Sequence, residues 1–354
     1  MRITFLMAAL DMGGGVRVVA QYAEGLRRRG HDVLVVAPPP RPYDLRGKLR
    51  NLIHRKVPSR HHHFESTGVA VKVLKQFRPI RASDVPPADV IIATWWETAE
   101  WLADFPADRG TPLHFVQDYE IWNGHKARVD ATLRLPVQKV TISEWLKAIL
   151  VDDLGADAPA VVANGVDPDL FFADARTMPA EPTIGFVYAP NPRKGSDLAV
   201  EAIANARKIV PNLRCVAFGH GEPTDALPLP DFVEYHMAPP QSQLRDIYGR
   251  CSAWLFASRE EGFGLPLLES MACGTPVIAA PAGAAPEILA SGGGTLLSSH
   301  DVGEMTDAII RYARLDSSEW DRISQEALQI SRDHSLERSV ASFVDFVESS
   351  IQTK

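Results

Sequence analysis

The chain has 354 residues, of which 45% are apolar and 23% are charged. This length is enough for about two domains, each with a core of its own. The formal net charge of −7 argues against a nucleic-acid-binding protein, because such proteins gather their ligand with a basic surface. Cys215, Cys251 and Cys273 have no CxxC spacing, which favours small buried thiols in a reducing compartment over disulfides or zinc.

The first residues predict a strand followed by a glycine loop, not a cleavable signal peptide. No apolar run approaches the ~20 residues that a membrane span needs. We therefore expect a cytoplasmic protein. Basic residues concentrate in the segment 45–63, which is open to two interpretations: a solvated helix face, or a peripheral contact with anionic lipid on the cytoplasmic face of the inner membrane.

Short apolar runs alternate with amphipathic stretches from the first residue onward. The run RITFLMA is followed by a glycine turn, a helical stretch and the strand-like HDVLVVAP, which together form one strand-helix-strand unit. Further strands are expected at 89–94, 112–117 and 139–143. This pattern is typical of a parallel sheet that helices cover on both faces.

A second alternating series follows an irregular segment at 161–182, which we interpret as a linker between domains. Its expected strands lie at 183–189, 214–219, 253–258 and 276–280. The sequence thus predicts an α/β fold with two Rossmann-like domains. Ligands bind beyond the carboxyl ends of strands in open parallel sheets, so we expect the site in a cleft between the domains.

Two glutamates, Glu261 and Glu269, are separated by seven residues in EGFGLPLLE. Glu261 falls in a loop after a strand, and Glu269 falls one turn into a helix that begins near Pro266. The N–H groups of Gly264 and Leu265 at the helix start suit an anionic group such as a diphosphate. Beside a phosphate, the carboxylates would bind sugar hydroxyls rather than exchange a proton. The alternative is that both are solvated charges.

Arg193 and Lys194 stand directly before Gly195 and a predicted helix. Two cations and a helix N-terminus therefore meet where a departing diphosphate would develop its charge. Stabilising that charge is the largest catalytic effect such a site offers. The alternative is a pair of ordinary surface charges.

Four stretches carry a resemblance to a known family: GGGVRVVAQYAEGLRRRGHDV, ANGVDPDLF, RKGSDLAVEAIANA and SREEGFGLPLLESMACGTPVIAAPAGAAPEIL. They resemble the family 4 glycosyltransferases, which are retaining, metal-independent enzymes of GT-B fold. The resemblance implies two Rossmann-like domains whose parallel sheets face each other across a cleft. It implies an acceptor domain at 1–165, a nucleotide-sugar donor domain at 166–331, and a final helix, about 332–354, that packs back on the first domain.

The resemblance also assigns roles in the donor site. Glu269 would bind the ribose hydroxyls, Glu261 would contact the donor sugar and act in catalysis, and Arg193 and Lys194 would hold the leaving diphosphate. The remaining donor-binding candidates are Gly219, Gly262, Phe263, Gly264 and Leu265. One departure stands out, because the position of the usual family arginine holds Ala189. Either Arg193 replaces that arginine, or the site depends more on Lys194 and on helix dipoles.

Gly13, Gly14 and Gly15 follow the first strand, but Val18 breaks the dinucleotide fingerprint GxGxxG. The resemblance implies that Gly13 and Gly14 bring backbone N–H groups close to the donor phosphate or the acceptor, with Arg17 nearby. A purely structural glycine turn is the alternative.

The acceptor site is expected around HFVQDYEIW at 114–122. Many family members carry a histidine where this chain has Gln117, and the sequence VQDYE looks closer to bacterial rhamnosyltransferases, which favours a deoxysugar donor. Asp118 or Glu120 would orient the acceptor hydroxyl or accept its proton. Both residues could instead cap the following segment.

A second acceptor candidate is the sequence ATWWETAEW at 93–101. Trp95, Trp96 and Glu97 would line a sugar subsite, because indole faces stack on sugars, although one of the two tryptophans could pack in the core. The sequence DPD at 167–169 is interpreted as a turn and His61–His63 as surface imidazoles, so no metal site is expected.

Together these features predict a hexosyltransferase that moves a sugar from a nucleotide-diphosphate sugar to an acceptor hydroxyl. The acceptor would be a glycan, a lipid-linked molecule or a small molecule, in bacterial cell-surface polysaccharide or glycoconjugate biosynthesis. No cofactor is expected beyond this co-substrate. The alternatives are a sugar-nucleotide epimerase of the same fold and a non-catalytic protein that binds glycans or nucleotides.

Overall fold

The computed structural model describes residues 1–41, 61–174 and 176–352. Most of the basic segment 45–63 therefore lies outside the described residues. The chain forms two compact units. The first comprises Met1–Ile142, Leu146–Val162 and Val340–Lys354, and the second comprises Ser143–Trp145 and Ala163–Ser339.

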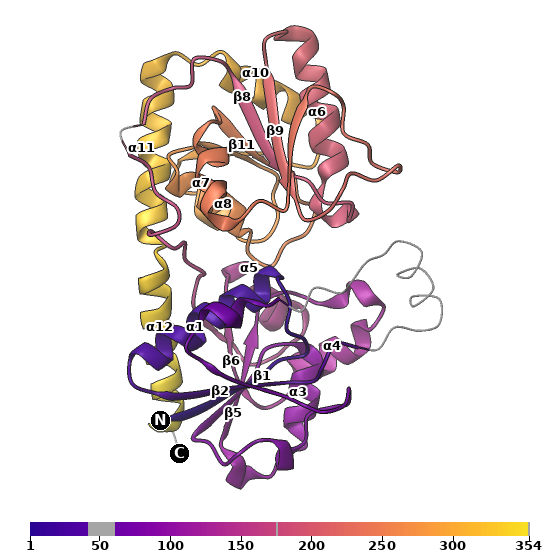
Figure 1. The fold of residues 1–354 in the computed structure, drawn as a ribbon, viewed down its shortest axis with the longest axis vertical. Coiled ribbons are helices and arrows are strands. Elements are labelled where there is room, and N and C mark those ends of the chain that lie inside the picture. The colour runs from indigo at the N-terminus through magenta and orange to yellow at the C-terminus, as the bar shows by residue number, and fades with distance from the viewer. Residues whose placement is uncertain (42–60, 175, 353–354) are drawn as a thin grey trace. The chain divides into compact units, whose positions relative to one another are not determined.

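A parallel sheet of seven strands in the order β3-β2-β1-β4-β5-β6-β7 forms the centre of the first unit (Figure 1). Its central strands β1, β4 and β5 are mostly buried, and β4 is buried along its whole length, as a sheet covered on both faces requires. The strands are β1 (Arg2–Leu6), β2 (Asp32–Ala37), β3 (Ala70–Val73), β4 (Val90–Ala93), β5 (Thr111–Val116), β6 (Gln138–Thr141) and β7 (Ala160–Val161).

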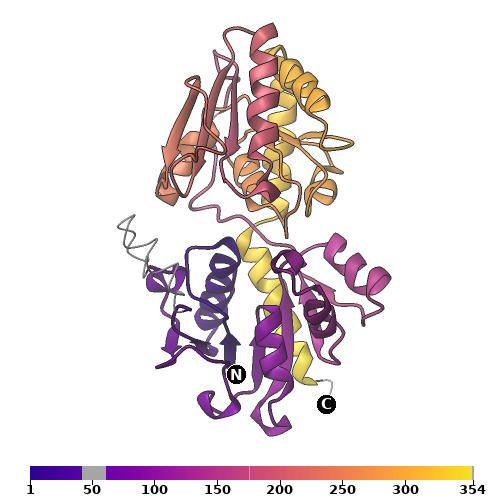
Figure 2. The ribbon, with the colours of Figure 1, turned by 90° about the vertical axis from the view of Figure 1, so that its right-hand side faces the viewer.

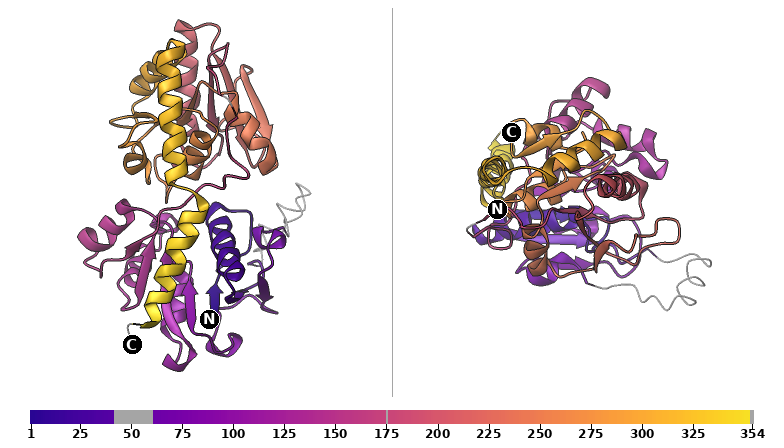
Figure 3. Two further views of the ribbon diagram at one scale, coloured as in Figure 1. Left: turned by 90° about the vertical axis from the view of Figure 1, so that its left-hand side faces the viewer. Right: turned by 90° about the horizontal axis from the view of Figure 1, so that it is seen from above.

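Helices cover both faces of this sheet. The helices of this unit are α1 (Gly14–Arg28), α3 (Trp96–Ala103) and α4 (Lys126–Leu133), together with the C-terminal parts of α5 (Glu144–Ala148) and α12 (Leu336–Gln352). Phe343 of α12 packs on Tyr22 of α1, with ring centroids 4.8 Å apart, and on Phe115 of β5, at 5.2 Å. This aromatic cluster holds the end of the chain on the first unit, where α12 is the yellow helix in Figure 3.

The second unit has a parallel sheet of six strands in the order β10-β9-β8-β11-β12-β13. Its strands are β8 (Thr183–Val187), β9 (Arg214–Gly219), β10 (Val233–Met237), β11 (Ala253–Phe256), β12 (Val277–Ala279) and β13 (Gly294–Leu296). With the first sheet, this confirms the predicted α/β fold class of two Rossmann-like domains.

The helices of the second unit pack on this sheet and on one another; α6 and α10 lie side by side in Figure 2. They are α6 (Ser196–Ile209), α7 (Gln241–Gly249), α8 (Leu265–Ala272), α9 (Ala285–Leu289), α10 (Val302–Ala313) and α11 (Ser317–Asp333).

Cys215, Cys251 and Cys273 are buried free thiols in this unit, as predicted, and burial raises the pKa of Cys251 and of Cys273 to about 12.

Two smaller predictions concern the segment before β8 and the membrane. Asp167 Oδ1 accepts a hydrogen bond of 2.9 Å from the N–H of Asp169, which makes the DPD sequence a turn. In the described part of the chain, no helix has the length and apolar character needed to cross a membrane.

Candidate active site

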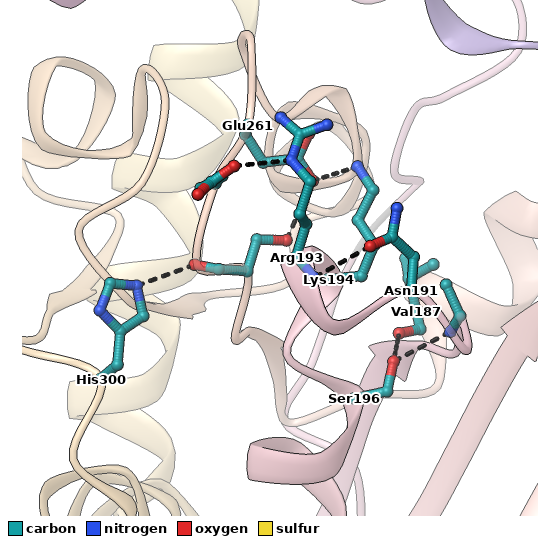
Figure 4. Close-up of polar contacts among 10 residues, drawn as sticks. Val187, Asn191, Arg193, Lys194, Ser196, Glu261 and His300 are labelled. Atoms are coloured by element: carbon teal, nitrogen blue, oxygen red, sulfur yellow. Dashed lines mark hydrogen bonds and ion pairs between the residues drawn. The ribbon is translucent and has the colours of Figure 1, made fainter. Parts of the chain in front are cut away.

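A lysine and a glutamate meet at the carboxyl edge of the second sheet. Strands β8 and β11 are hydrogen-bonded neighbours, so the loops that follow them lie next to each other. Lys194 Nζ, from the loop after β8, lies 2.6 Å from Glu261 Oε1, from the loop after β11 (Figure 4). Ser258 Oγ donates to the same carboxylate oxygen at 2.9 Å. Two donors thus hold one carboxylate oxygen, and the ammonium group is fixed in place.

Arg193 lies beside this pair and is tied to the same loop. Its Nε donates to Glu260 Oε2 at 2.8 Å, and its carbonyl oxygen accepts a hydrogen bond of 2.7 Å from the N–H of Arg259. The Arg193 side chain is 19% exposed, so the guanidinium group lies mostly within the surface of the two loops. In Figure 4 the side chains of Arg193 and Lys194 extend toward Glu261.

The turn that presents these cations needs glycine at its end. Gly195 has φ +61°, and a Cβ atom there would lie 1.8 Å from the carbonyl oxygen of Ala257. The buried hydroxyl of Ser196 accepts a hydrogen bond from the N–H of Ala189 at 2.9 Å. Ala189, where the family arginine would stand, thus contributes only its backbone to this loop.

The second glutamate lies in the helix that follows the same loop. Gly264 has φ +103° and precedes Leu265, the first residue of α8. Glu269 is only 2% exposed, and its Oε2 accepts a hydrogen bond of 2.8 Å from the hydroxyl of buried Tyr248. The alternative of two solvated charges is therefore wrong, since Glu261 is held by Lys194 and Glu269 is buried.

The other predicted donor residues lie at the same edge of the sheet. Gly262 and Phe263 are buried between Glu261 and α8, and Leu265 is half-buried. Gly219 ends β9, the neighbour of β8, where a Cβ atom would lie 2.3 Å from the carbonyl oxygen of Tyr188. They follow or end strands of the same sheet, and their roles toward a nucleotide stay predictions.

The glycine loop of the first unit leads into α1. Gly13 donates its N–H to Asp11 Oδ1 at 2.7 Å, and a Cβ atom on Gly14 would meet no other atom within 4 Å. A Cβ atom on Gly15 would lie 3.6 Å from Oε1 of Gln117, so the structure brings this loop against the end of β5. Arg17 lies half-buried in the first turn of α1.

The two adjacent tryptophans have different surroundings. Trp96 is 3% exposed and packs in an apolar cluster with Val116, Val129 and Leu133, because it lies on the inner face of α3. The prediction that Trp96 lines an acceptor subsite is therefore wrong. Trp95 is half-buried, and Glu97 is half-buried and lies 3.2 Å from Arg41.

Glu120 is a buried carboxyl group. Its Oε2 accepts a hydrogen bond of 2.9 Å from the N–H of Trp96, the first residue of α3, so it caps that helix rather than the segment that follows it. Burial raises the pKa of Glu120 well above its ordinary value; the Trp96 N–H acts in the opposite direction, and the Asp118 and Glu97 charges raise it further. Asp118 is half-buried and accepts from the N–H of Tyr119 at 2.8 Å.

Three polar residues at these sites were not predicted. Ser258 holds Glu261, Tyr248 holds Glu269, and His300 Nε2 lies 3.1 Å from the carbonyl oxygen of Ser258. Ser258 stands three residues before Glu261, so its position in the sequence could have suggested the contact. Tyr248 and His300 come from other elements, and only the folded chain brings them to the site.

Two protein-family models match consecutive parts of the chain. The model described as Glycosyltransferase Family 4 matches residues 12–170, and the model described as Glycosyl transferases group 1 matches residues 171–329. The boundary between the two matches lies in the linker before β8. The Lys194–Glu261 pair and Glu269 lie in the second match.

A relative by sequence is the D-inositol 3-phosphate glycosyltransferase of Mycolicibacterium smegmatis, which is 32% identical over 206 residues. The alignment covers 52% of this chain and 46% of that relative, so the chain matches about half of the relative's length. This name does not support the rhamnosyltransferase-like interpretation, which depended on the few residues around Gln117.

Solved structures of the same fold include the sucrose-phosphate synthase from Thermosynechococcus elongatus, with a TM-score of 0.77, 18% identity and full coverage of both chains. Another is Anabaena Alr3699/HepE in complex with UDP-glucose, with a TM-score of 0.76, 18% identity, and coverage of 99% of this chain and 100% of that one. These likenesses confirm the GT-B fold. The two family matches are contiguous and together extend from residue 12 to residue 329, so the chain is similar to these two glycosyltransferase families over that range.

Proposed function

We propose that this protein transfers a sugar from a nucleotide-diphosphate sugar to an acceptor hydroxyl, with retention of the anomeric configuration and without a metal ion. The observation that carries the proposal is the Lys194–Glu261 pair at the carboxyl ends of β8 and β11, at 2.6 Å. Ligands of open parallel sheets bind at such strand ends. The pair therefore stands where a donor binds in this fold.

Lys194 provides positive charge for the leaving diphosphate. An ammonium group has three N–H donors, and one of them is held by Glu261. The other two then bind diphosphate oxygens as negative charge develops on them. Because Glu261, itself held by Ser258, fixes the ammonium group in advance, little reorganisation is needed at the moment of bond breaking.

Arg193 takes the part of the arginine that the family has at the position of Ala189. It follows Pro192 in the same turn as Lys194, and its backbone is fixed by Arg259. A guanidinium group binds phosphate oxygens with two parallel hydrogen bonds. When the donor binds, Arg193 exchanges its contact with the exposed Glu260 for the phosphate.

The two glutamates bind the two ends of the donor. Lys194 and Ser258 both contact Oε1 of Glu261, so Oε2 is oriented to accept a hydrogen bond from a hydroxyl of the donor sugar. Glu269, oriented by Tyr248, accepts hydrogen bonds from the ribose hydroxyls. The start of α8 between them places its N–H groups toward the phosphates.

Transfer follows a same-face displacement through an oxocarbenium-like state, since no carboxylate is assigned as a covalent nucleophile. Asp118 orients the acceptor hydroxyl or accepts its proton. Glu120 is less suited to this role, because its side chain is buried and its Oε2 already accepts the N–H of Trp96 at the start of α3. Glycan or glycoconjugate biosynthesis in the cytoplasm, with the basic segment 45–63 as a membrane contact, is part of the proposal on sequence grounds alone.

The proposal is tested by a thermal-shift screen of nucleotide sugars, with UDP-glucose as the first donor, followed by turnover on candidate acceptors. We expect a donor to raise the melting temperature and to be consumed only when an acceptor is added. The coupling constant of the anomeric proton in the product reports retention, and turnover in EDTA reports metal independence. Donor isomerisation without acceptor would establish the epimerase alternative, and failure of every nucleotide sugar to bind would establish the non-catalytic one.

A further inference from the structure

Two partly exposed tryptophans form a pair at the carboxyl edge of the first sheet. Trp95 follows β4, and Trp122 lies in the short 3-10 turn η4 (Ile121–Asn123) after β5, the strand next to β4. Their ring centroids are 5.9 Å apart, and the ring planes make an angle of 67°. Both residues are half-buried, so part of each remains exposed to solvent. This edge belongs to the same unit as the glycine loop.

The backbone at Trp95 is fixed from both sides. Thr98 Oγ1 accepts from the N–H of Trp95 at 3.0 Å and donates to the Trp95 carbonyl oxygen at 2.7 Å. The next N–H, that of Trp96, is held by the buried carboxyl group of Glu120. A rigid aromatic side chain loses little conformational entropy on binding, so this position is suited to recognition.

Trp96 supports the pair from within the unit. Its ring packs against Arg128, whose guanidinium carbon lies 4.6 Å from the ring centroid, and against His125 at 5.5 Å. Both partners come from α4 or its first flanking residue, which follows the turn that carries Trp122. The loop with Trp122 and the helix that starts after Trp95 are thereby packed together.

Three cations in the segments around this pair lie against carboxylates. Arg41 lies 3.2 Å from Glu97, Arg128 lies 2.6 Å from Glu100, and Lys126 lies 2.6 Å from Asp130. The buried Glu120 is a further carboxyl group at this edge, and the charges of Asp118 and Glu97 both act on it. A phosphate group at this edge would have to displace these carboxylates, whereas a neutral sugar would find hydrogen-bond acceptors and apolar ring faces.

We propose that the acceptor is a saccharide with an uncharged ring that stacks on Trp95 and Trp122, with its hydroxyl groups hydrogen-bonded to Glu97 and Asp118. This inference rests on the proposed transferase function and names its acceptor class. It differs from the acceptor in the name of the mycobacterial relative, D-inositol 3-phosphate. The first unit then recognises the acceptor by its ring faces rather than by charge.

The inference is tested by titrating matched probes into the full chain saturated with UDP and following tryptophan fluorescence. The pairs are glucose with glucose 6-phosphate and myo-inositol with D-myo-inositol 3-phosphate, with maltose as a longer neutral probe. We expect neutral probes to bind more tightly than their phosphorylated partners. Trp122→Leu, which keeps apolar volume but removes the flat ring, should weaken neutral-probe binding about tenfold, and Trp122→Phe should restore part of it.

Trp101→Leu is the matched control, because Trp101 is a partly buried tryptophan of the same helix α3 that packs in a different apolar cluster. It should leave probe affinity unchanged. Tighter binding of the phosphorylated partner, no neutral-probe binding at millimolar concentration, or equal affinities for Trp122→Leu and the parent would each overturn the inference. Donor binding, measured in parallel by thermal shift with UDP-glucose, separates these results from a failure of the proposed function itself.

Discussion

The carboxyl edges of the two sheets carry different chemistry on the same architecture. In the second unit, glycine turns present Arg193 and Lys194, and each of these cations is held by a carboxylate on the neighbouring loop. In the first unit, the edge presents Trp95 and Trp122 and a buried carboxyl group. Pre-positioned cations are suited to a phosphate, and fixed indole rings are suited to a sugar ring. Under the proposed function, this difference corresponds to donor recognition in the second unit and acceptor recognition in the first.

Removing the lysine tests the donor side of this comparison most severely. Lys194→Ala should lower turnover on the order of a hundredfold or more, because the charge that develops on the leaving diphosphate loses its closest cation. Lys208→Ala is the matched control, since Lys208 lies in the last turn of α6 and its Nζ donates to Asn205 of the same helix at 2.8 Å. Steady-state kinetics with saturating acceptor measure both variants. Near-normal turnover of Lys194→Ala would end the proposed role.

Removing one hydroxyl should separate binding from chemistry in the same unit. Tyr248→Phe leaves the ring in place but removes the 2.8 Å hydrogen bond to Glu269. A hydrogen bond to a charged group contributes roughly 1.5–3 kcal/mol, so the KM for the donor should rise about tenfold or more while kcat changes little.

Tyr312→Phe controls for the loss of a buried hydroxyl, because Tyr312 Oη lies 3.2 Å from Thr295 Oγ1 in the same unit. If both variants raise the donor KM equally, Tyr248 acts through stability and not through Glu269. A fall in kcat with no change in KM would also contradict the positioning role.

Acid should weaken the first unit through a buried histidine of β5. Burial, with a smaller effect of Lys139, lowers the pKa of His114 from 6.5 to about 3. The unfolded chain therefore takes up this proton first as the pH falls, so the stabilising contribution is present above pH 6.5 and is lost between 6.5 and 3. His114→Met should flatten the dependence of unfolding free energy on pH by up to about 1.4 kcal/mol per pH unit.

Chemical denaturation at several pH values within this window measures the effect. If the free energy of unfolding depends on pH equally in His114→Met and in the parent, His114 takes up its proton in the folded protein. Because His114 lies in the first unit, donor binding by the second unit provides an internal reference that this variant should leave unchanged.

The smallest expected effect concerns Glu120, the buried carboxyl group at the carboxyl edge of the first sheet. The pKa of Glu120 is raised in the folded state, so its contribution to stability is largest at low pH and declines as the pH rises above 4.5. Glu120→Gln keeps an oxygen that accepts from the Trp96 N–H. Its free energy of unfolding should therefore stay within about 0.5 kcal/mol of that of the parent at low pH, and it should not decline as the pH rises.

Thermal unfolding across pH checks this prediction, with Glu120→Ala as the contrast. The alanine variant leaves the N–H of Trp96 without its acceptor, so its free energy of unfolding should be about 1–3 kcal/mol lower than that of the parent at every pH. A glutamine variant as damaging as alanine would mean that Glu120 is needed as a carboxylate, which would reopen its role as a base.

Much of the fold and part of the candidate donor site could be predicted from local patterns. The alternation of apolar runs and amphipathic stretches predicts two parallel sheets, and Pro266 after the loop with Glu261 predicts the start of α8. The carboxyl edge of the first sheet was harder to predict, because adjacent Trp95 and Trp96 have the same side chain and their burial depends on which face of α3 packs inward. Trp122 carries no local signal of a pair with Trp95.

The sequence by itself determined the two-domain α/β organisation, the positions of the glycine turns and the candidate residues Lys194, Glu261 and Glu269. Only the tertiary structure decided which of these residues meet. Lys194 and Glu261 are 67 positions apart, and they touch because β8 and β11 are neighbours in the sheet. Glu120 caps a helix that precedes it by 24 positions for the same kind of reason. Strand order and packing set such distances, and neither is encoded in the neighbourhood of a single residue.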